Sequence, residues 1–444
     1  MNNFTQLVSI NNIQKVILVL FLFTSMSLVS FAQKSSSHSP YSEYGIGQMR
    51  GDYSPQMRAM GNISTGLRYL SGMPVLNVSN PAAYSGLQRT VFEAAMYGNI
   101  TQLSKGSISD HTADFAFSQI VIGIPLSGKA GGFAFGLLPF SDVGYSNSET
   151  RVLDTIQYKQ NISGEGGLNK AFIGYGVSPV KGLSVGANVG LIFGHLSDIS
   201  SIDFPVNLRA YSSVLSEKRE IKGATVDYGL QYFKPLGNNK HITIGYSGSL
   251  NNTLTNTSTR LITRSDPFTG TDVSDQIAKD TISLTKSPSR KINLPLKHNV
   301  GISVAKGYNW MVGADFKYTD WSDFQTRVNE QPLGKDYGFS IGGQVKPDPT
   351  SINFLNQVDY RLGFRYNRLP YKLKGTDIND MAITVGFGFP LPETNFGQTF
   401  SSINISAEAG QLGTLSNNLV RERYINLNLS LSINDSWFRK RRHD

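Results

Sequence analysis

Cysteine is absent from this 444-residue chain, which excludes a disulfide framework, thiolate catalysis, cysteine-based metal centres and a lipid anchor on an N-terminal cysteine. Charge is also scarce, because only 16 % of the residues are charged, against about 25 % in ordinary soluble proteins. Long apolar runs are missing after residue 32, so no later stretch reaches the roughly 18 apolar residues that mark a transmembrane helix. What the chain has instead is glycine (44 residues) and aromatic residues (11 %), which is not the composition of a disordered protein.

The first 32 residues predict a secretory signal peptide. Lys15 precedes an apolar run from Val16 to Phe31, and Ser30 and Ala32 place small residues before a cleavage site. An uncleaved membrane anchor is the alternative, but the run is short for a span of about 20 residues. We therefore expect residues 1–32 to be removed and the exported chain to begin near Gln33.

Most of the remaining chain repeats with a period of two residues. Near the C-terminus, Ile425, Leu427, Leu429, Leu431 and Ile433 alternate with asparagine and serine, and similar alternation occurs near residues 314, 360 and 385. A soluble sandwich would expose a face rich in Lys, Glu and Thr, whereas the second face here is mostly Gly, Ser and Asn. Lipid outside and a wet or plugged lumen inside fit this pattern, and in lipid only helices and closed barrels satisfy the backbone. The sequence predicts an all-β protein, a transmembrane β-barrel of the Gram-negative outer membrane.

Strand counting predicts a 14-stranded antiparallel barrel over residues 88–438. Fifteen candidate strand cores become fourteen when 182–196 and 202–216 are taken as one long strand, bent at Ser197 to Ser201, with the chain reversing near 216–221. The resulting hairpins cover residues 90–125, 132–178, 182–235, 240–305, 309–346, 356–389 and 400–434. A basic tail at 439–444 would follow in the periplasm, where it would contact lipid headgroups or a partner, and not nucleic acid.

Residues 33–87 break the two-residue period. They are rich in Ser, Gly, Met and Asn, and they are too long for a tail. We expect this segment to form an N-terminal luminal hatch, or plug. A disordered periplasmic extension is the alternative.

Two motifs in this segment resemble those of a known family. Met57-Arg58-Ala59-Met60-Gly61, followed by Asn80-Pro81-Ala82-Ala83 before the first strand, resembles the N-terminal signature of the long-chain fatty acid outer-membrane transporters (the FadL type). The resemblance implies a fourteen-stranded barrel, a hatch that includes Gly61, Asn80 and Pro81, and a hydrophobic substrate that leaves sideways where the third strand kinks inward. Pro139 in the third strand removes a ladder donor and is the candidate for this lateral gap; a turn at the membrane edge is the alternative.

No enzyme constellation is present in the sequence. The six histidines show no metal-ligand spacing, and the serine-hydrolase, phosphate-loop and zinc-protease motifs are missing. We expect a protein that is not an enzyme and that uses neither a metal nor a cofactor.

Candidate ligand-binding residues follow from strand parity. If Ile120, Ile122 and Ile124 face lipid, Phe115 and Phe117 face the lumen, and Phe172 and Phe233 have the inward parity of their own strands. These rings could pack against the plug, line a hydrophobic pocket, or both. Three inward cations, Lys317, Arg361 and Arg365, could pair with a carboxylate headgroup or form an ion-pair network that braces barrel and plug.

Two functions fit these expectations. The first is outer-membrane transport of small, fatty-acid-like hydrophobic molecules through the plugged barrel, with lateral exit near strand 3. The second is a non-enzymatic barrel subunit or adaptor of an outer-membrane protein secretion or assembly complex. An intact hatch in an apolar lumen would favour the first, whereas a large apolar surface outside the lipid would favour the second. The partners expected are outer-membrane lipid, a small hydrophobic ligand or a protein, and not nucleic acid.

Overall fold

The computed structural model describes residues 38–435, apart from 127–129, 206–207, 209, 267–277, 326–332 and 393–398. The expected signal peptide and the basic tail at 439–444 lie outside the described residues. Within the described part, no helix is long and apolar enough to cross a membrane.

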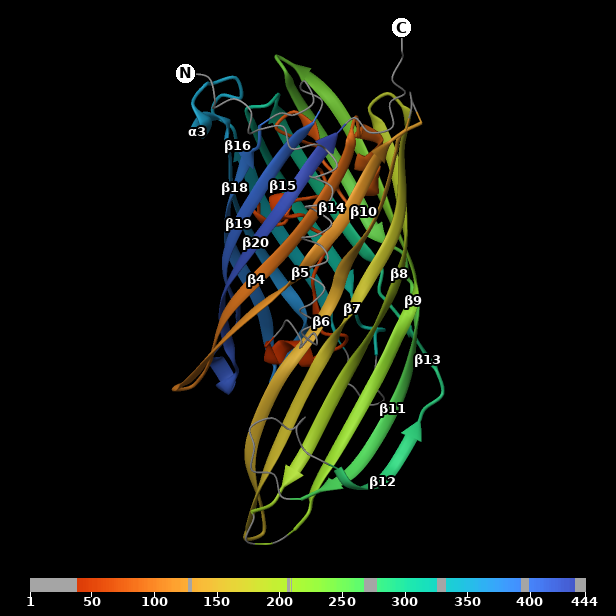
Figure 1. Ribbon diagram of the computed structural model, residues 1–444, viewed down its shortest axis with the longest axis vertical. Helices are drawn as coiled ribbons and strands as arrows, with labels where there is room; N and C mark the ends of the chain where they lie inside the picture. The colour runs from red at the N-terminus through yellow and green to blue at the C-terminus, as the bar shows by residue number, and fades with distance from the viewer. Residues whose placement is uncertain are drawn as a thin grey trace, which may run out of the picture. The chain divides into compact units, whose positions relative to one another are not determined.

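A closed antiparallel β-barrel extends from Thr90 to Asp435 (Figure 1). Six strands come first, then two broken strands, then six more, which makes fourteen and confirms the predicted fold. Pairing of the last strand with the first, from Arg421 opposite Ser104 to Asp435 opposite Thr90, closes the barrel. The strands are β4 (Thr90–Lys105), β5 (Ile108–Pro125), β6 (Gly132–Leu153), β7 (Ile156–Val180), β8 (Leu183–Asp203) and β9 (Ser212–Gly237); the broken strands β10 (Lys240–Ser249) with β11 (Thr253–Ser265), and β12 (Ala278–Lys286) with β13 (Arg290–Asn293) and β14 (Lys297–Lys306); then β15 (Trp310–Asp320), β16 (Lys335–Val345), β17 (Asp359–Leu373), β18 (Thr376–Pro390), β19 (Phe400–Gly413) and β20 (Arg421–Asp435).

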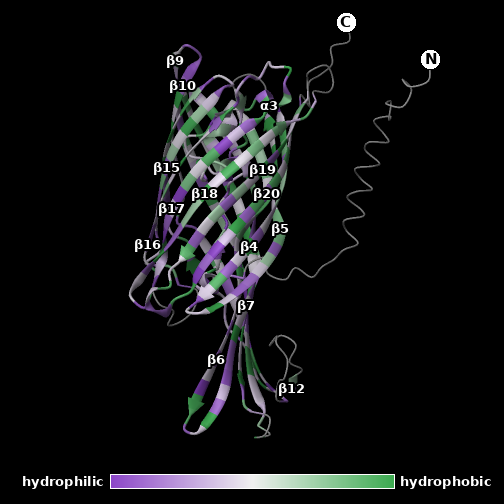
Figure 2. Ribbon diagram, turned by 90° about the vertical axis from the view of Figure 1, so that its left-hand side faces the viewer, coloured by the Kyte–Doolittle hydropathy of each residue, from purple (hydrophilic) through white to green (hydrophobic). Residues whose placement is uncertain are grey.

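Alternation along the strands separates the two faces of the wall, as the banded colouring of Figure 2 shows. In β20, Ile425 and Leu427 are each 48 % exposed, whereas Asn428 and Ser430 are 4 % and 1 % exposed. The apolar side chains therefore lie on the outer face of the barrel and the small polar ones face its interior. This is the reverse of a soluble barrel and the arrangement of a membrane barrel.

Strands β6 to β9, with β11 and β12, extend beyond the others at one end of the barrel (Figure 1). The ladder between β6 and β7 continues to Leu153 opposite Ile156, so the predicted hairpin 132–178 is paired as far as its tip. The predicted reversal near 216–221 was wrong, because β8 ends at Asp203 and β9 begins at Ser212. Pro205, which has no N–H for the ladder and accepts a turn hydrogen bond from Leu208, begins this reversal.

Residues 38–87, here called the N-terminal segment, lie against the inward face of the barrel (red to orange in Figure 1). Met57, Met60, Ile63 and Leu67 are at most 2 % exposed and pack with Met311 of β15. These residues of the segment are therefore packed against the wall, and their role as a plug stays a prediction. The segment contains the 3₁₀ helices η1 (Pro40–Glu43) and η2 (Pro81–Gly86), the helix α2 (Pro55–Arg58) and the short strands β1 (Gln48–Met49), β2 (Tyr69–Leu70) and β3 (Met73–Pro74); α3 (Phe354–Gln357) and η5 (Ser416–Asn418) lie in connections between barrel strands.

Candidate functional site: the barrel interior and the β5–β6 seam

The Asn-Pro-Ala-Ala motif forms the start of η2. The Asn80 side chain is fully buried; it caps η2 by accepting a hydrogen bond from the Ala82 N–H, and it donates to the Thr65 carbonyl over 2.7 Å. Pro81 occupies the first turn, where its missing N–H costs nothing. A Cβ at Gly186 of β8 would lie 2.4 Å from the Pro81 carbonyl carbon, so η2 docks directly on the strand backbone.

Gly61 makes a second close backbone contact. Its φ of +71° is in the left-handed region, and a Cβ there would lie 2.6 Å from the Phe364 carbonyl oxygen. The Gly61 N–H donates to Thr384 Oγ1 over 2.9 Å, and the Thr384 hydroxyl donates to the Ala59 carbonyl. Both family-like motifs thus occur where the N-terminal segment touches the barrel wall.

A buried ion cluster fastens the segment to β7 and β9. Lys170 Nζ lies 3.0 Å from Asp52 Oδ2 and 2.6 Å from Asp227 Oδ2. Burial alone would raise the pKa of the Asp52 carboxyl, but the positive charges of Lys170 and Lys297 outweigh it, so this pKa lies below its ordinary value. One cation thus joins a carboxylate of the segment to a carboxylate of the barrel.

Further hydrogen bonds hold the middle of the segment. Asp315 of β15 accepts the backbone N–H groups of Ser64 and Thr65 over 2.7 and 2.8 Å. The Arg68 guanidinium donates to Ser184 of β8 over 2.9 Å. Lys317, one of the predicted inward cations, lies 4.4 Å from the centre of the Tyr53 ring and donates to the carbonyl of Asn62.

The other two predicted cations are paired within the wall. Arg361 bonds Asp359, Gln344 and Asn404 at 2.7–3.1 Å. Arg365 bonds Asp380 and Glu408 at 2.5 and 2.7 Å. These partners all belong to β16 to β19 of the wall, so these bonds brace the wall itself. A role in ligand binding stays a prediction for these residues.

The four predicted aromatic residues divide into two pairs. Phe172 is 5 % exposed and packs with Tyr84 and Leu76 of the N-terminal segment. The Phe233 ring lies 5.5 Å from that of Tyr69 in the same segment. Both face inward and pack on the plug, and their contact with a ligand remains a prediction.

Phe115 and Phe117 are on the outer face instead, at 70 % and 37 % exposure. In β5, Gln119 pairs with Ala95 but Phe117 pairs with Met96, so Ser118 is the extra residue of a β-bulge. An extra residue in a strand exchanges the inward and outward faces for all residues on one side of it. Extrapolation from Ile120 across Ser118 therefore placed the two rings in the lumen. This part of the prediction was wrong.

A seam between β5 and β6 surrounds Pro139. The two strands pair only from Pro125 opposite Gly132 to Ile120 opposite Leu137, although β5 has 18 residues and β6 has 22. Pairing stops two residues before Pro139, and a bulge follows between Pro139 and Ser141. The position agrees with an interrupted ladder; that it serves as a lateral exit remains a prediction.

The N-terminal segment occupies part of this seam. Strand β1 pairs with β6, with Met49 opposite Ser141 and Gln48 opposite Asp142. The Arg50 N–H donates to the Phe140 carbonyl, and its side chain lies 2.5 Å from Asp142. The edge that β5 leaves is therefore taken by a strand of the plug.

Two cavities lie where the segment meets the wall. One of about 120 Å³ is lined by Asp52, Lys170 and Asp227 together with Met49 and Trp321, and another of about 50 Å³ is lined by Arg50, Arg365 and Glu422. Pockets for drug-sized ligands usually measure about 300–1,000 Å³. These cavities are smaller, and charged groups surround both.

Sequence reasoning missed Asp52, Lys170 and Arg68, which carry much of the attachment. Lys170 shares the parity of Phe172, so its inward position was available from the pattern. Asp52 and Arg68 lie in a segment without periodicity, where no such signal exists.

These features define a closed fourteen-stranded barrel whose own N-terminal segment packs inside it. Solved structures with this fold include a Pseudomonas aeruginosa FadL homologue (12 % identity, 88 % of this chain and 100 % of that chain covered, TM-score 0.57). The Ralstonia pickettii toluene transporter TbuX (15 %, 86 % and 98 %, 0.55) and the P. putida toluene transporter TodX (16 %, 87 % and 99 %, 0.54) are also similar. At these identities the likeness concerns the fold.

The chain belongs to the BamG family, whose model matches residues 12–444. The resemblance seen in the sequence is thus confirmed for the FadL-type fold, but the family is BamG and not that of the fatty acid transporters. No curated protein matches the chain.

Proposed function

We propose that this protein is a non-enzymatic barrel subunit of a protein assembly in the Gram-negative outer membrane, and that its N-terminal segment is a fixed core and not a valve. The observation that carries this proposal is the way the segment is attached. Asp52 bonds β7, Ser64 and Thr65 bond Asp315 of β15, and Arg68 bonds β8, through contacts that are largely buried. Opening the lumen would break several of them together.

The energetic argument follows from burial. Breaking a buried ion pair by removing one partner costs about 3–5 kcal/mol, because a charge is left unpaired in a medium of low dielectric. Displacing the segment would separate Lys170 from Asp52 and also release the backbone bonds to Asp315. A passive passage for small molecules has no energy source to offset such a cost.

Apolar side chains outside the lipid-facing band support a protein partner. Val152 and Leu153 at the tip of β6 are 62 % and 60 % exposed, and Ile282 and Leu284 of β12 are 53 % and 67 % exposed. These strands belong to the protruding part of the barrel, where lipid would not cover them (Figure 1). Exposed apolar surface of this kind is typical of protein contacts. Membership of the BamG family also supports a protein partner.

The second candidate function is transport of small hydrophobic molecules, with lateral exit at the β5–β6 seam. The seam at Pro139 and the fold shared with the two toluene transporters favour it. On this view β1 would leave the edge of β6 when a substrate passes.

Native mass spectrometry of the protein, extracted from its own membrane in mild detergent, separates the two. We expect a stoichiometric protein partner and a barrel without small-molecule adducts. A monomer that carries one or two bound masses of a few hundred daltons would overturn the subunit proposal in favour of transport.

A further inference from the structure

The outer face of the barrel has a groove along β19. Ala409 faces outward between Ile383 of β18 and Ile425 of β20, which are its direct cross-strand neighbours. The next outward residue toward the other end of the barrel is again an alanine, Ala407, between Val385 and Leu427. Two successive small residues between ridges of large ones leave a hollow, and the one at Ala409 measures about 500 Å³.

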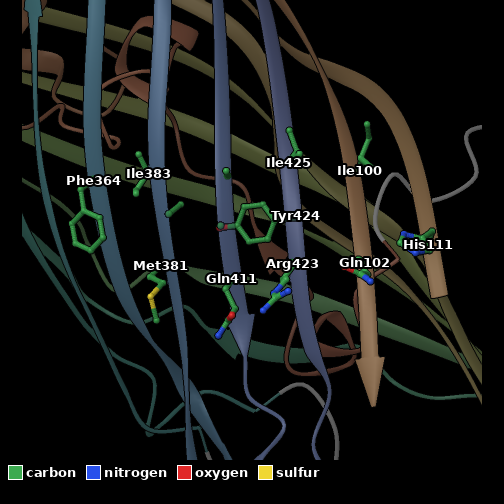
Figure 3. A pocket seen from close by; sticks show the side chains of 13 residues that line it. Ile100, Gln102, His111, Phe364, Met381, Ile383, Gln411, Arg423, Tyr424 and Ile425 are labelled. Carbon is green, nitrogen blue, oxygen red and sulfur yellow. The ribbon is translucent and has the colours of Figure 1, made fainter. Parts of the chain in front are cut away.

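One end of this groove is polar. Gln411, Arg423, Gln102 and His111 are directly opposite one another on β19, β20, β4 and β5, and so form a single row across four strands. Figure 3 shows Arg423 and Gln411 on the side of the hollow away from the isoleucines. The row therefore marks the boundary between the apolar band and the polar rim.

The charge of this row is of one sign. None of the thirteen residues that line the hollow is acidic. Arg423 is exposed, and among the described residues it forms no ion pair. Arg365 and Arg219, in contrast, each bond a carboxylate. A guanidinium left without a carboxylate at the edge of an apolar groove suits an external anion, and phosphate above all, because its oxygens match the guanidinium fork.

We propose that this groove binds a membrane lipid with an anionic phosphate headgroup, whose phosphate contacts Arg423 and whose acyl chain lies over Ala409 and Ala407. From Gln411 to Ile405 the groove follows six residues of strand, about 20 Å, which accommodates an extended acyl chain. The row lies three residues before the end of β4, toward the β4–β5 turn and at the end of the barrel where β6 and β7 also turn, and hence near one edge of the lipid-facing band. The proposal requires only that the barrel lies in a membrane, so it is independent of the choice between subunit and transporter.

The test uses the full-length protein in mild detergent, titrated with an equimolar mixture of phosphatidylglycerol and phosphatidylcholine with the same acyl chains. Native mass spectrometry counts the bound lipids. We expect about fivefold enrichment of the anionic lipid, the ratio that one exposed charge pair of about 1 kcal/mol gives. Arg423→Gln should abolish the enrichment, and Ala409→Phe, which fills the groove, should reduce binding of both lipids.

Two matched variants serve as controls. Arg260→Gln removes an exposed cation on β11, and Ala187→Phe enlarges an exposed alanine on β8, both remote from the groove. Enrichment that survives Arg423→Gln, or that is lost equally in the controls, would overturn the proposal. Competition by soluble glycerol phosphate, without any effect of Ala409→Phe, would show a phosphate site and contradict lipid binding.

Discussion

Replacement of Lys170 by methionine tests whether the N-terminal segment is a fixed core. Lys170 is only 3 % exposed, and its ammonium group lies between Asp52 and Asp227 at 3.0 and 2.6 Å. Methionine keeps most of the side-chain volume but leaves two carboxylates facing each other without the ammonium group that contacts both, although the charge of Lys297 remains nearby. Loss of one partner from a buried pair costs about 3–5 kcal/mol. Asp52 belongs to the segment, so the loss falls on its attachment, and local opening should become roughly 10²- to 10⁴-fold more frequent.

Amide hydrogen exchange of the full-length protein measures this opening directly. We expect faster exchange in Lys170→Met for peptides that cover residues 48–60, with little change in the ladder between β19 and β20. Lys181→Met, which removes an exposed cation from the turn after β7, is the control and should leave exchange as it is. Adding Asp52→Asn to Lys170→Met should restore much of the protection, because the two carboxylates then no longer repel each other and Asp227 keeps the positive charge of Lys297 nearby. Unchanged exchange in Lys170→Met would refute the reasoning.

Three further predictions concern the same segment. In Met49→Cys/Ser141→Cys the two residues are directly opposite in β1 and β6, so their Cα atoms lie about 4.5–5.5 Å apart, within reach of a disulfide; the oxidised protein should keep its partner in native mass spectrometry, whereas a transporter would lose uptake of its substrate. Gly61→Ala should lower the thermal unfolding temperature more than Gly375→Ala, because both have φ above +70° but only Gly61 has a carbonyl oxygen 2.6 Å from the new Cβ; equal losses would show that the contact is not tight. The lowered pKa of Asp52 means that its stabilisation is complete above the unfolded-state pKa of about 3.9 and is lost only as the pH falls through the lower folded-state pKa; thermal unfolding should thus show no loss from this group between pH 7 and pH 5, and a loss in the wild type that Asp52→Asn abolishes would contradict it.

The wall of the barrel was predictable because lipid imposes a strict rule on it. Each outward side chain must be apolar and each backbone group must be paired, so a period of two residues is forced on every strand. Ile425 and Leu427 outside, with Asn428 and Ser430 inside, show this rule in the structure. The number of strands followed from counting such segments between short turns.

The errors in the site arose where one residue changes parity or ends a strand. The bulge at Ser118 moved Phe115 and Phe117 to the outer face, yet no residue type there distinguishes a bulge from regular pairing. Likewise, Pro205 begins the turn between β8 and β9, but polar stretches lie on either side of it, so the sequence pattern did not distinguish the turn from the strands. Register is a property of two strands, and a single strand read alone does not reveal it.

Partners of the inward charges could not be predicted for a related reason. Parity placed Arg361 and Arg365 inside, but most of their acceptors come from other strands, and Lys170 is matched by Asp52 from a segment with no periodicity at all. Pairing of this kind is fixed only when the whole barrel closes around its plug.

Charged side chains need a partner inside the barrel but not at its outer surface, and the charged residues of this chain differ accordingly. Inside, buried charges must be paired, and the pairs between Lys170 and Asp52 and between Arg50 and Asp142 tie the N-terminal segment to β7 and β6 of the wall. Outside, where lipid can supply the partner, Arg423 is left with no carboxylate among the described residues. A plug that moves during transport would need weak attachments to the wall. The distribution seen here, with strong attachments inside and an open contact on the surface, is the one that the proposed subunit role requires.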